Sequence, residues 1–436
     1  MIFPIRILKD GFNERGIYLN LQTPILNNVL LSLEFKENLR PPWLSNNKSD
    51  PIFFSFVYKN ITDGDVLVFL SDGREKFPAV VRQGNKIIFN FDPKATIEFL
   101  LNEKYLVTNK LFYHFIPFHY HLIPGRIRRY IKKLTVLLQK KTANKDRLKF
   151  PSWPVETSVE TIKHVFFICQ KLLSNLDLKL QSSWPENKKF AVVLSHDIDT
   201  TEGFRNIDKF TRLEKRYNVR SCWFVVGQFF ASYKDQLTAL RQDGFEIGCH
   251  GYLHDNKLIT SNRKKMRESL LKCSEMLKKL DVKGFRSPSL LRSRQLFEAL
   301  EDLFLYDTSV PDTEAFLQIA PRSGCCTVFP YKILGNLLEL PITLPLDSTL
   351  LALNFKPNQI YEVWKEKIGW IKKLGGMAHI ATHAESYYCG SSDMLRAYEQ
   401  LLDFISKDSD CWIANPKDLA IWWQEKVKLN DFVLMK

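Results

Sequence analysis

The sequence contains few of the features that mark membrane, secreted or disulfide-rich proteins. None of its 436 residues lies in a uniformly apolar run of about 20, the length that a membrane-spanning helix needs. Arg6 and Lys9 interrupt the first apolar run and no small-residue cleavage site follows, so we expect no secretory signal. The eight cysteines include no Cys-x-x-Cys pair, which favours reduced thiols. We therefore expect a cytoplasmic protein.

The composition is that of a globular protein with a local excess of basic residues. Apolar residues make up 45% of the chain and charged residues 25%, which excludes a disordered or collagenous chain. The formal net charge is +14, and residues 126–149 hold ten basic residues against one acidic residue. This run is either a solvated helix or linker, or a contact with an anionic membrane surface or substrate. No nucleic-acid fold signature accompanies it, so we expect no nucleic-acid partner.

The chain divides into two regions with different sequence patterns, joined by a basic segment. Residues 1–125 contain short apolar runs separated by turn signals, which indicates a small β-rich α/β domain. Residues 126–150 form the basic helix or linker. From residue 151 to 436, short buried strands such as Ala191–Leu194 alternate with amphipathic helices such as Asn206–Tyr217. That alternation predicts an α/β fold with a parallel sheet, either open or closed into a barrel.

Ionisable residues follow three of the predicted strands. Asp197 and Asp199 come after Ala191–Leu194, and His250 and His254 come after a strand at 246–249. His383 ends a third strand. Because parallel strands present their carboxyl ends at one edge, we expect these side chains to lie together.

Clustered carboxylates and imidazoles favour a divalent cation. His250 and His254 are four residues apart, so one turn or loop can direct both imidazoles at a single point. With one aspartate they make two nitrogen ligands and one oxygen ligand, which suits catalytic zinc or Fe(II). The second aspartate then lies close enough to act as a general base.

Six segments resemble, in the same order, the motifs of the polysaccharide deacetylase family, the NodB-homology carbohydrate esterases. They span about residues 189–390, and their combination is far more specific than any one of them. The segments are residues 190–199 (FAVVLSHDID), 222–227 (CWFVVG), 244–254 (GFEIGCHGYLH), 284–288 (GFRSP), 306–310 (YDTSV) and the late His383.

The resemblance implies a distorted (β/α) barrel of about seven strands. It also implies that Asp199, His250 and His254 bind one divalent metal ion. Zinc is the preferred ion, with cobalt, nickel or iron as alternatives.

The same resemblance implies three catalytic roles. Asp197 would be the general base, and Arg286 would orient it and keep it ionised. His383 would be the general acid that protonates the leaving amine. His379 lies four residues earlier, and we expect it to support the site from the core and not to bind metal.

The sequence departs from the family pattern at several positions. Ile198 separates the two motif aspartates, and Gly251 stands where the family has Ser or Thr. The D-x-x-D-W motif that helps to shape the substrate groove is missing, and Asp307 and Asp312 are the nearest acids. The sequence therefore does not identify the substrate.

Three residues are candidates for substrate binding. They are Asp307, Asp347 and Pro288. Asp347 follows an apolar stretch, so it could equally cap a helix or begin a turn.

The resemblance implies a hydrolase that removes an N-acyl group from a sugar. Because we expect a cytoplasmic protein, the substrate would be a lipid-linked or nucleotide-linked glycan precursor in surface polysaccharide biosynthesis. The basic run would then bring the protein to the inner face of the membrane. The alternatives are an amidase for another C–N bond and a catalytically silent glycan-binding or scaffold protein. The sequence suggests no role for residues 1–125 and no oligomeric state.

Overall fold

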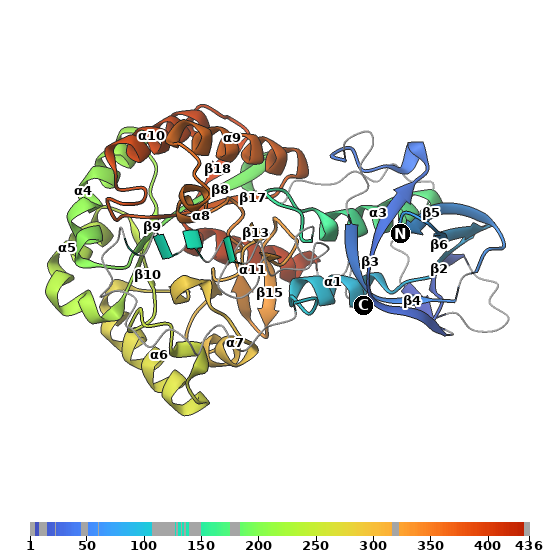
Figure 1. Cartoon of the computed structure of the whole chain (residues 1–436), viewed down its shortest axis with the longest axis horizontal. Coiled ribbons are helices and arrows are strands. Elements are labelled where there is room, and N and C mark those ends of the chain that lie inside the picture. Colours follow the sequence, from blue (N-terminus) through green and yellow to red (C-terminus); the bar gives the residue numbers. More distant parts are fainter. Residues whose placement is uncertain are drawn as a thin grey trace.

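A computed structural model gives the fold of most of the chain. Its residues form two large sheets with separate cores, which Figure 1 shows side by side. The described residues are 5–7, 15–21, 23–44, 51–59, 61–106, 127, 130, 131, 133, 134, 137, 138, 150–174, 184–315 and 322–430.

The N-terminal sheet has seven strands in the order β1-β2-β7-β6-β5-β3-β4. Strands β3 to β7 pair antiparallel, whereas β1 and β2 add parallel strands at one edge. The strands are β1 (Ile5–Ile7), β2 (Gly16–Leu19), β3 (Pro24–Phe35), β4 (Pro51–Tyr58), β5 (Asp65–Ser71), β6 (Lys76–Gln83) and β7 (Lys86–Phe89).

Two helices complete the core of this sheet. Helix α1 (Pro93–Leu101) begins at Asp92, whose side chain accepts a hydrogen bond from the backbone N–H of Ala95. Helix α3 (Ser158–Ser174) buries Val159, Ile162 and other apolar residues in the same core. Helix α3 follows the predicted boundary at residue 151, yet its apolar side chains pack with the N-terminal sheet.

The second sheet confirms the predicted α/β fold. Seven strands run parallel in the order β16-β12-β11-β10-β9-β8-β17, β18 pairs parallel with β8, and β15 is antiparallel at one edge. The strands are β8 (Phe190–Ile198), β9 (Cys222–Val225), β10 (Glu246–Cys249), β11 (Gly284–Phe285), β12 (Tyr306–Asp307), β15 (Tyr331–Leu334), β16 (Leu337–Glu339), β17 (Met377–His383) and β18 (Cys411–Ile413).

The sheet curls into a distorted barrel that backbone contacts close. The N–H groups of Thr343 and Leu344, which follow β16, donate to the carbonyl of His379 on β17 at 3.2 and 3.1 Å. Helices surround the strands in Figure 1. They are α4 (Thr201–Arg216), α5 (Phe230–Gln242), α6 (Arg263–Leu277), α7 (Arg294–Leu300), α8 (Asp347–Ala352), α9 (Pro357–Leu374), α10 (Ser392–Ser406) and α11 (Pro416–Asn430), and a hairpin of β13 (Glu314–Ala315) and β14 (Arg322–Ser323) joins them.

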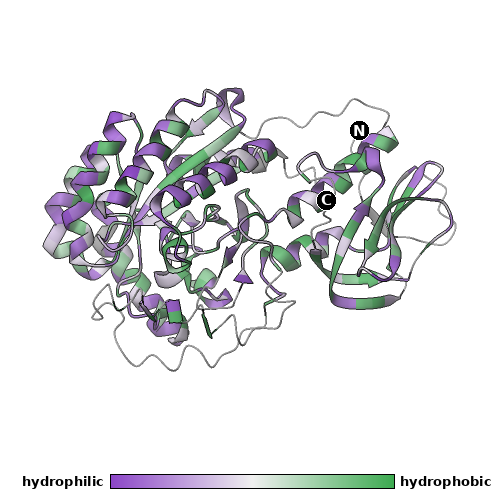
Figure 2. Cartoon of the chain, turned by 45° about the horizontal axis from the view of Figure 1, so that its top comes forward, coloured by the Kyte–Doolittle hydropathy of each residue, from purple (hydrophilic) through white to green (hydrophobic). Residues whose placement is uncertain are grey.

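Strand β8 is longer than its apolar run predicts. All nine residues are buried, including Ser195, His196 and Asp197. The polar residues stay in the strand because each has a buried partner; His196, for example, contacts Thr382 and Glu214 at 2.7 Å. Figure 2 shows the wider pattern, in which the helices around the barrel alternate between hydrophobic and hydrophilic positions.

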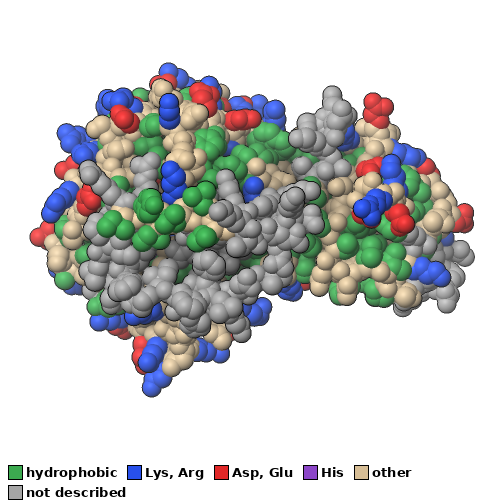
Figure 3. All heavy atoms as spheres, in the orientation of Figure 1, with side chains coloured by type: hydrophobic (Ala, Val, Ile, Leu, Met, Phe, Trp, Pro, Cys, Tyr) green, Lys and Arg blue, Asp and Glu red, His purple; other side chains and the backbone are tan. Residues whose placement is uncertain are grey.

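Most of the basic run 126–149 lies outside the described residues. Most of the apolar side chains that are described there are exposed, with Ile127 at 50% and Tyr130 at 62%. Among the described helices, none is both long and apolar enough to cross a bilayer. On the face in Figure 3, basic and acidic side chains alternate around the rim of the barrel.

Close packing inside the barrel predicts that Gly284→Ala destabilises the protein. A Cβ at Gly284 would lie 2.0 Å from the Tyr306 ring, which is fully buried and whose hydroxyl donates to Glu246 at 2.6 Å. We expect a loss of about 1–3 kcal/mol in the free energy of unfolding, measured by denaturant titration. Gly369→Ala on α9, with no atom within 4 Å of its Cβ, is the matched control and should be neutral or stabilising. Equal stability of the two variants would contradict this packing.

Candidate active site

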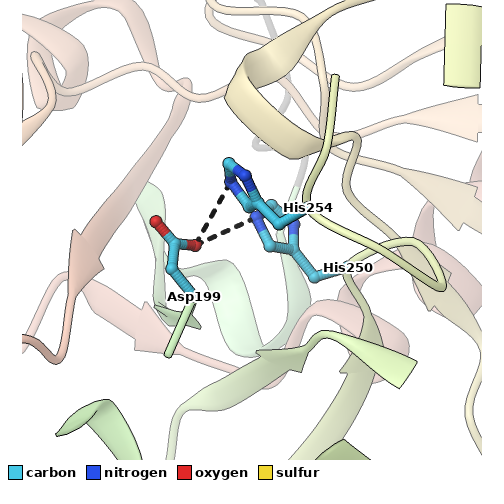
Figure 4. A group of neighbouring side chains, drawn as sticks. All are labelled: Asp199, His250 and His254. Atoms are coloured by element: carbon cyan, nitrogen blue, oxygen red, sulfur yellow. Dashed lines mark ion pairs between the residues drawn. The ribbon is translucent and has the colours of Figure 1, made fainter. Parts of the chain in front are cut away.

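Asp199, His250 and His254 converge at the carboxyl ends of β8 and β10. Their ligand atoms all lie within 4.8 Å of one another, and all three residues are buried. Oδ1 of Asp199 is 3.4 Å from Nε2 of His250 and 3.5 Å from Nε2 of His254. Figure 4 shows both imidazoles directed at this one oxygen. The structure therefore brings together the three residues that the sequence predicted as ligands.

The spacing of these atoms fits a divalent cation. Two ligands that lie about 2.1 Å from a tetrahedral zinc ion, about 109° apart, are about 3.4 Å from each other. Oδ1 of Asp199 is buried and has no hydrogen bond of good geometry among the described residues. Burial would raise the pKa of this carboxyl, but His254 and His250 outweigh burial and hold the pKa below its usual range. An ionised carboxylate whose Oδ1 lies between two imidazoles without a hydrogen bond suits a metal ion.

A backbone contact orients His250 for ligation. Its Nδ1 lies 2.9 Å from the carbonyl oxygen of Arg286, which can only accept a hydrogen bond. The proton must therefore be on Nδ1, which leaves the lone pair of Nε2 directed at Asp199. Metal-binding histidines are commonly fixed in this way.

Asp197 lies beside this group and forms a buried ion pair with Arg286. Nη1 of Arg286 is 2.6 Å from Oδ1 of Asp197, and the Arg286 side chain is completely buried. Its other nitrogens donate to Oγ of Ser195 and Oγ1 of Thr308, both at 2.7 Å. Burial would raise the pKa of Asp197, but the guanidinium together with the nearby imidazoles outweighs burial and lowers it. Asp197 is thus an ionised carboxylate inside the barrel.

The structure places His379 in the core behind Arg286. Its Nε2 lies 3.2 Å from Nη2 of Arg286, and its Nδ1 lies 3.2 Å from the carbonyl oxygen of Leu340. Burial and the neighbouring guanidinium lower the pKa of His379 to about 3. The neutral imidazole supports the arginine, as expected from the sequence.

His383 faces the site from β17, paired in register with Asp197 on β8. Its Nδ1 is 2.7 Å from Oδ1 of Asp347, and 15% of its side chain is exposed. Burial disfavours the charged imidazole, but the carboxylates of Asp347, Asp199 and Asp197 together outweigh burial and raise the pKa of His383 to about 9. This imidazole carries a proton at neutral pH.

Asp347 is fully buried at the start of α8. Besides the imidazole of His383, it accepts the backbone N–H groups of His383 and Cys389, at 3.0 and 3.1 Å. Asp347 therefore holds both the backbone and the imidazole of His383 in place. Its predicted contact with substrate stays a prediction.

The other two candidates for substrate binding are also buried. Asp307 accepts hydrogen bonds from the backbone N–H and hydroxyl of Ser309, at 2.9 and 2.8 Å, and burial raises its pKa. Pro288 packs against Gly251, where a Cβ would lie 3.1 Å from the proline ring. Gly251 has a φ of +71°, which explains a glycine in place of Ser or Thr. Substrate contact by Asp307 and Pro288 stays a prediction.

Glu385 is a functional neighbour to which the sequence reasoning gave no role. Its Oε1 accepts hydrogen bonds from the backbone N–H groups of Asp199 and Thr200, both at 3.0 Å. A Cβ at Gly203 would lie 2.9 Å from the same oxygen. Burial and the nearby Asp199 raise the pKa of Glu385 to about 8. An acid two residues after the strand that ends in His383 was the available signal.

Comparisons with known proteins show what the chain is similar to. The sequence model of the family described as polysaccharide deacetylase matches residues 185–305. A peptidoglycan deacetylase of Helicobacter pylori is 22% identical over 228 residues, which are 46% of this chain and 78% of that protein.

Solved structures resemble the chain at low sequence identity. One from Mycobacterium smegmatis, assigned to the polysaccharide deacetylases, has 20% identity and a TM-score of 0.49, and covers 60% of this chain and 98% of its own. A family 4 carbohydrate esterase pseudoenzyme of Bacillus anthracis has 16% identity and a TM-score of 0.38, and covers 54% of this chain and 66% of its own.

The matched residues include the strands that carry most of the site. Strands β8, β10 and β11, with the residues that follow them, supply Asp197, Asp199, His250, His254 and Arg286, and all lie between residues 185 and 305. Residues 185–305, which carry these five residues, are therefore similar in sequence to the polysaccharide deacetylase family.

Proposed function

We propose that this protein is a metal-dependent hydrolase that removes an acetyl or formyl group from the nitrogen of a sugar. The observation that carries the proposal is the ionised Asp197, held by Arg286 beside the Asp199, His250 and His254 group. The protonated His383 faces the same space. A base and an acid on either side of a cation site are the groups that amide hydrolysis needs.

The side chains suit each step of that reaction. A divalent cation held by Asp199, His250 and His254 would supply Lewis acidity for the acyl carbonyl and for a water molecule that attacks it. Asp197 accepts a proton from that water while the oxygen atom of the water forms a bond to the acyl carbon. His383 donates its proton to the nitrogen as the C–N bond breaks. The products are a carboxylic acid and a free amine.

Zinc is the ion that we propose, with cobalt, nickel and iron as alternatives. Two imidazole nitrogens and one carboxylate oxygen form a three-ligand set that leaves positions open, as catalytic zinc sites do. The same ligands suit Fe(II).

A lipid-linked or nucleotide-linked glycan precursor of surface polysaccharide is the substrate that we propose. The basic run would place the protein on the anionic inner face of the membrane. The exposed Ile127 and Tyr130 support this placement, because apolar side chains among basic residues suit an interface.

Two other functions remain as alternatives. An amidase for another C–N bond would use the same residues and release a different product. A silent glycan-binding or scaffold protein would need no base beside the cation site, and the intact Asp197–Arg286 pair counts against it.

The two aspartates should have separable functions. Asp199→Ala should abolish zinc binding, measured by elemental analysis after dialysis, because it removes the only carboxylate of the ligand group. Asp197→Asn should keep the metal and lower the release of acetate or formate by about 10²–10⁴-fold. A wild-type protein that binds no divalent metal under any loading condition would rule out the hydrolase. Release of ammonia or urea would favour the amidase.

The pH dependence of activity should report on Asp347. His383 must be protonated to act as the acid, so kcat/KM should fall as the pH rises through its pKa of about 9. Asp347→Asn removes the anion that contributes most to raising this pKa, and the basic limb should move down by about 1–3 pH units. Asp393→Asn, in an exposed pair with Arg396, is the control and should leave the limb in place. An unmoved limb in the Asp347 variant would refute the acid role of His383.

The basic run should bind anionic vesicles. We expect co-sedimentation with phosphatidylglycerol vesicles that weakens with salt, since each basic residue near the surface contributes about 1 kcal/mol. Reversing the charges of Arg128, Arg129, Lys132 and Lys133 should abolish it.

Reversal of four exposed charges elsewhere is the control for vesicle binding. Arg263, Lys264, Lys278 and Lys279 are exposed on and after α6, and their reversal should weaken binding much less. The membrane contact would be excluded if the wild-type protein fails to bind at low salt.

A further inference from the structure

Residues 287–292 form a loop next to the site. The loop contacts several of the segments that surround the site. The loop follows Arg286 and ends before α7. The backbone N–H of Ser287 donates to Oγ of Ser309 at 2.8 Å, and Oγ of Ser289 donates to Oδ1 of Asn256 at 3.0 Å. Pro288 packs against Gly251. The loop thus touches the segment that carries His250 and His254.

This loop adopts a conformation that its residues disfavour. Ser289 and Leu290 have φ angles of +54° and +53°, in the left-handed region that costs free energy for residues other than glycine. The Leu290 side chain is buried with Leu346 and Ala381, which are close in sequence to Asp347 and His383. Such a conformation persists only where surrounding contacts hold it.

Arg292 supplies one of those contacts. Its Nη1 donates to the carbonyl oxygens of Leu290 and Ser309, at 2.9 and 3.4 Å. Its side chain is only 3% exposed. A guanidinium this deeply buried needs an anion close by, because burying an unpaired charge is costly.

The anion comes from the N-terminal part of the chain. Glu103, which follows α1, forms a two-pronged ion pair with Nε and Nη2 of Arg292, and Nε is 2.6 Å from Oε2. The Glu103 side chain is 11% exposed. The pair is therefore shielded from water and bidentate, which is the strong form of an arginine–carboxylate contact.

Two further hydrogen bonds attach the segment around Glu103 to the barrel. The hydroxyl of Tyr105 donates to the carbonyl oxygen of Gly324 at 2.6 Å, and the hydroxyl of Tyr331 donates to that of Leu101 at 3.3 Å. Figure 1 shows α1 at the junction of the two parts of the molecule. Residues before and after Glu103 in the sequence, Leu101 and Tyr105, are thus hydrogen-bonded to the barrel.

We propose that Glu103 is a positioning residue of the active site. Through Arg292 it holds Ser289 and Leu290 in their left-handed conformation, and so fixes the wall that Pro288 and Leu290 form beside the cation site. The N-terminal domain then contributes to catalysis without touching the substrate. The effect on catalysis rests on the proposed hydrolase function.

The test separates positioning from stability with a double replacement. Glu103→Leu alone leaves Arg292 buried without its anion, so stability and activity should both fall. The double variant Glu103→Leu/Arg292→Met removes both charges, so thermal stability and zinc content should return toward the wild-type values. Its kcat should stay about ten- to a hundredfold low, because the carbonyls of Leu290 and Ser309 have lost their donor.

Hydrogen–deuterium exchange gives a readout that does not depend on activity. Peptides covering residues 287–292 should exchange faster in the double variant and in Glu103→Gln, which keeps the shape of the side chain. A wild-type kcat in the double variant, or unchanged exchange in Glu103→Gln, would overturn the proposal.

The controls keep this proposal distinct from the proposed function. The pair of Arg216 and Glu399 is more exposed, and its replacement by Met and Leu should change neither kcat nor the exchange of residues 287–292. If the wild-type protein hydrolyses no acylated sugar, the proposed function fails. The exchange of Glu103→Gln then still decides whether Glu103 positions the loop.

Discussion

The buried contact between Arg286 and Asp197 is the interaction on which the rest of the site depends. One guanidinium binds Asp197, Ser195 and Thr308, and stacks 4.1 Å from the centre of the Phe224 ring. A buried ion pair contributes little net stability, yet removing one partner costs about 3–5 kcal/mol because a charge is left alone. What the pair provides is a buried carboxylate that stays charged, beside the group of Asp199, His250 and His254.

Similar support recurs around the site, where a second residue holds each of the other candidate residues. The carbonyl of Arg286 sets the tautomer of His250, Asp347 orients His383, and Glu385 holds the backbone of Asp199. The supporting residues come from different strand ends, because the curled parallel sheet gathers those ends at one edge. The barrel therefore places the residues of the site close together, and supporting side chains from distant parts of the sequence set their orientation and charge.

The sequence predicted the parts of the site that depend on local pattern. An apolar strand followed by Asp197 and Asp199 is visible in the sequence alone, and so is the spacing of His250 and His254. Long-range packing is not visible there. Glu103 and Arg292 are 189 residues apart, and no periodicity links them. Helix α3 was equally unpredictable as a neighbour of the N-terminal sheet, because its apolar face suits either core.

The central claim is that Asp199, His250 and His254 hold a catalytic cation beside the ionised Asp197. X-ray diffraction from zinc-loaded crystals, at energies on either side of the zinc absorption edge, tests this claim most directly. The account predicts one strong anomalous peak per chain, about 2.0–2.2 Å from Oδ1 of Asp199 and from Nε2 of each histidine. A zinc-loaded crystal without that peak, or with its zinc bound elsewhere, would contradict it.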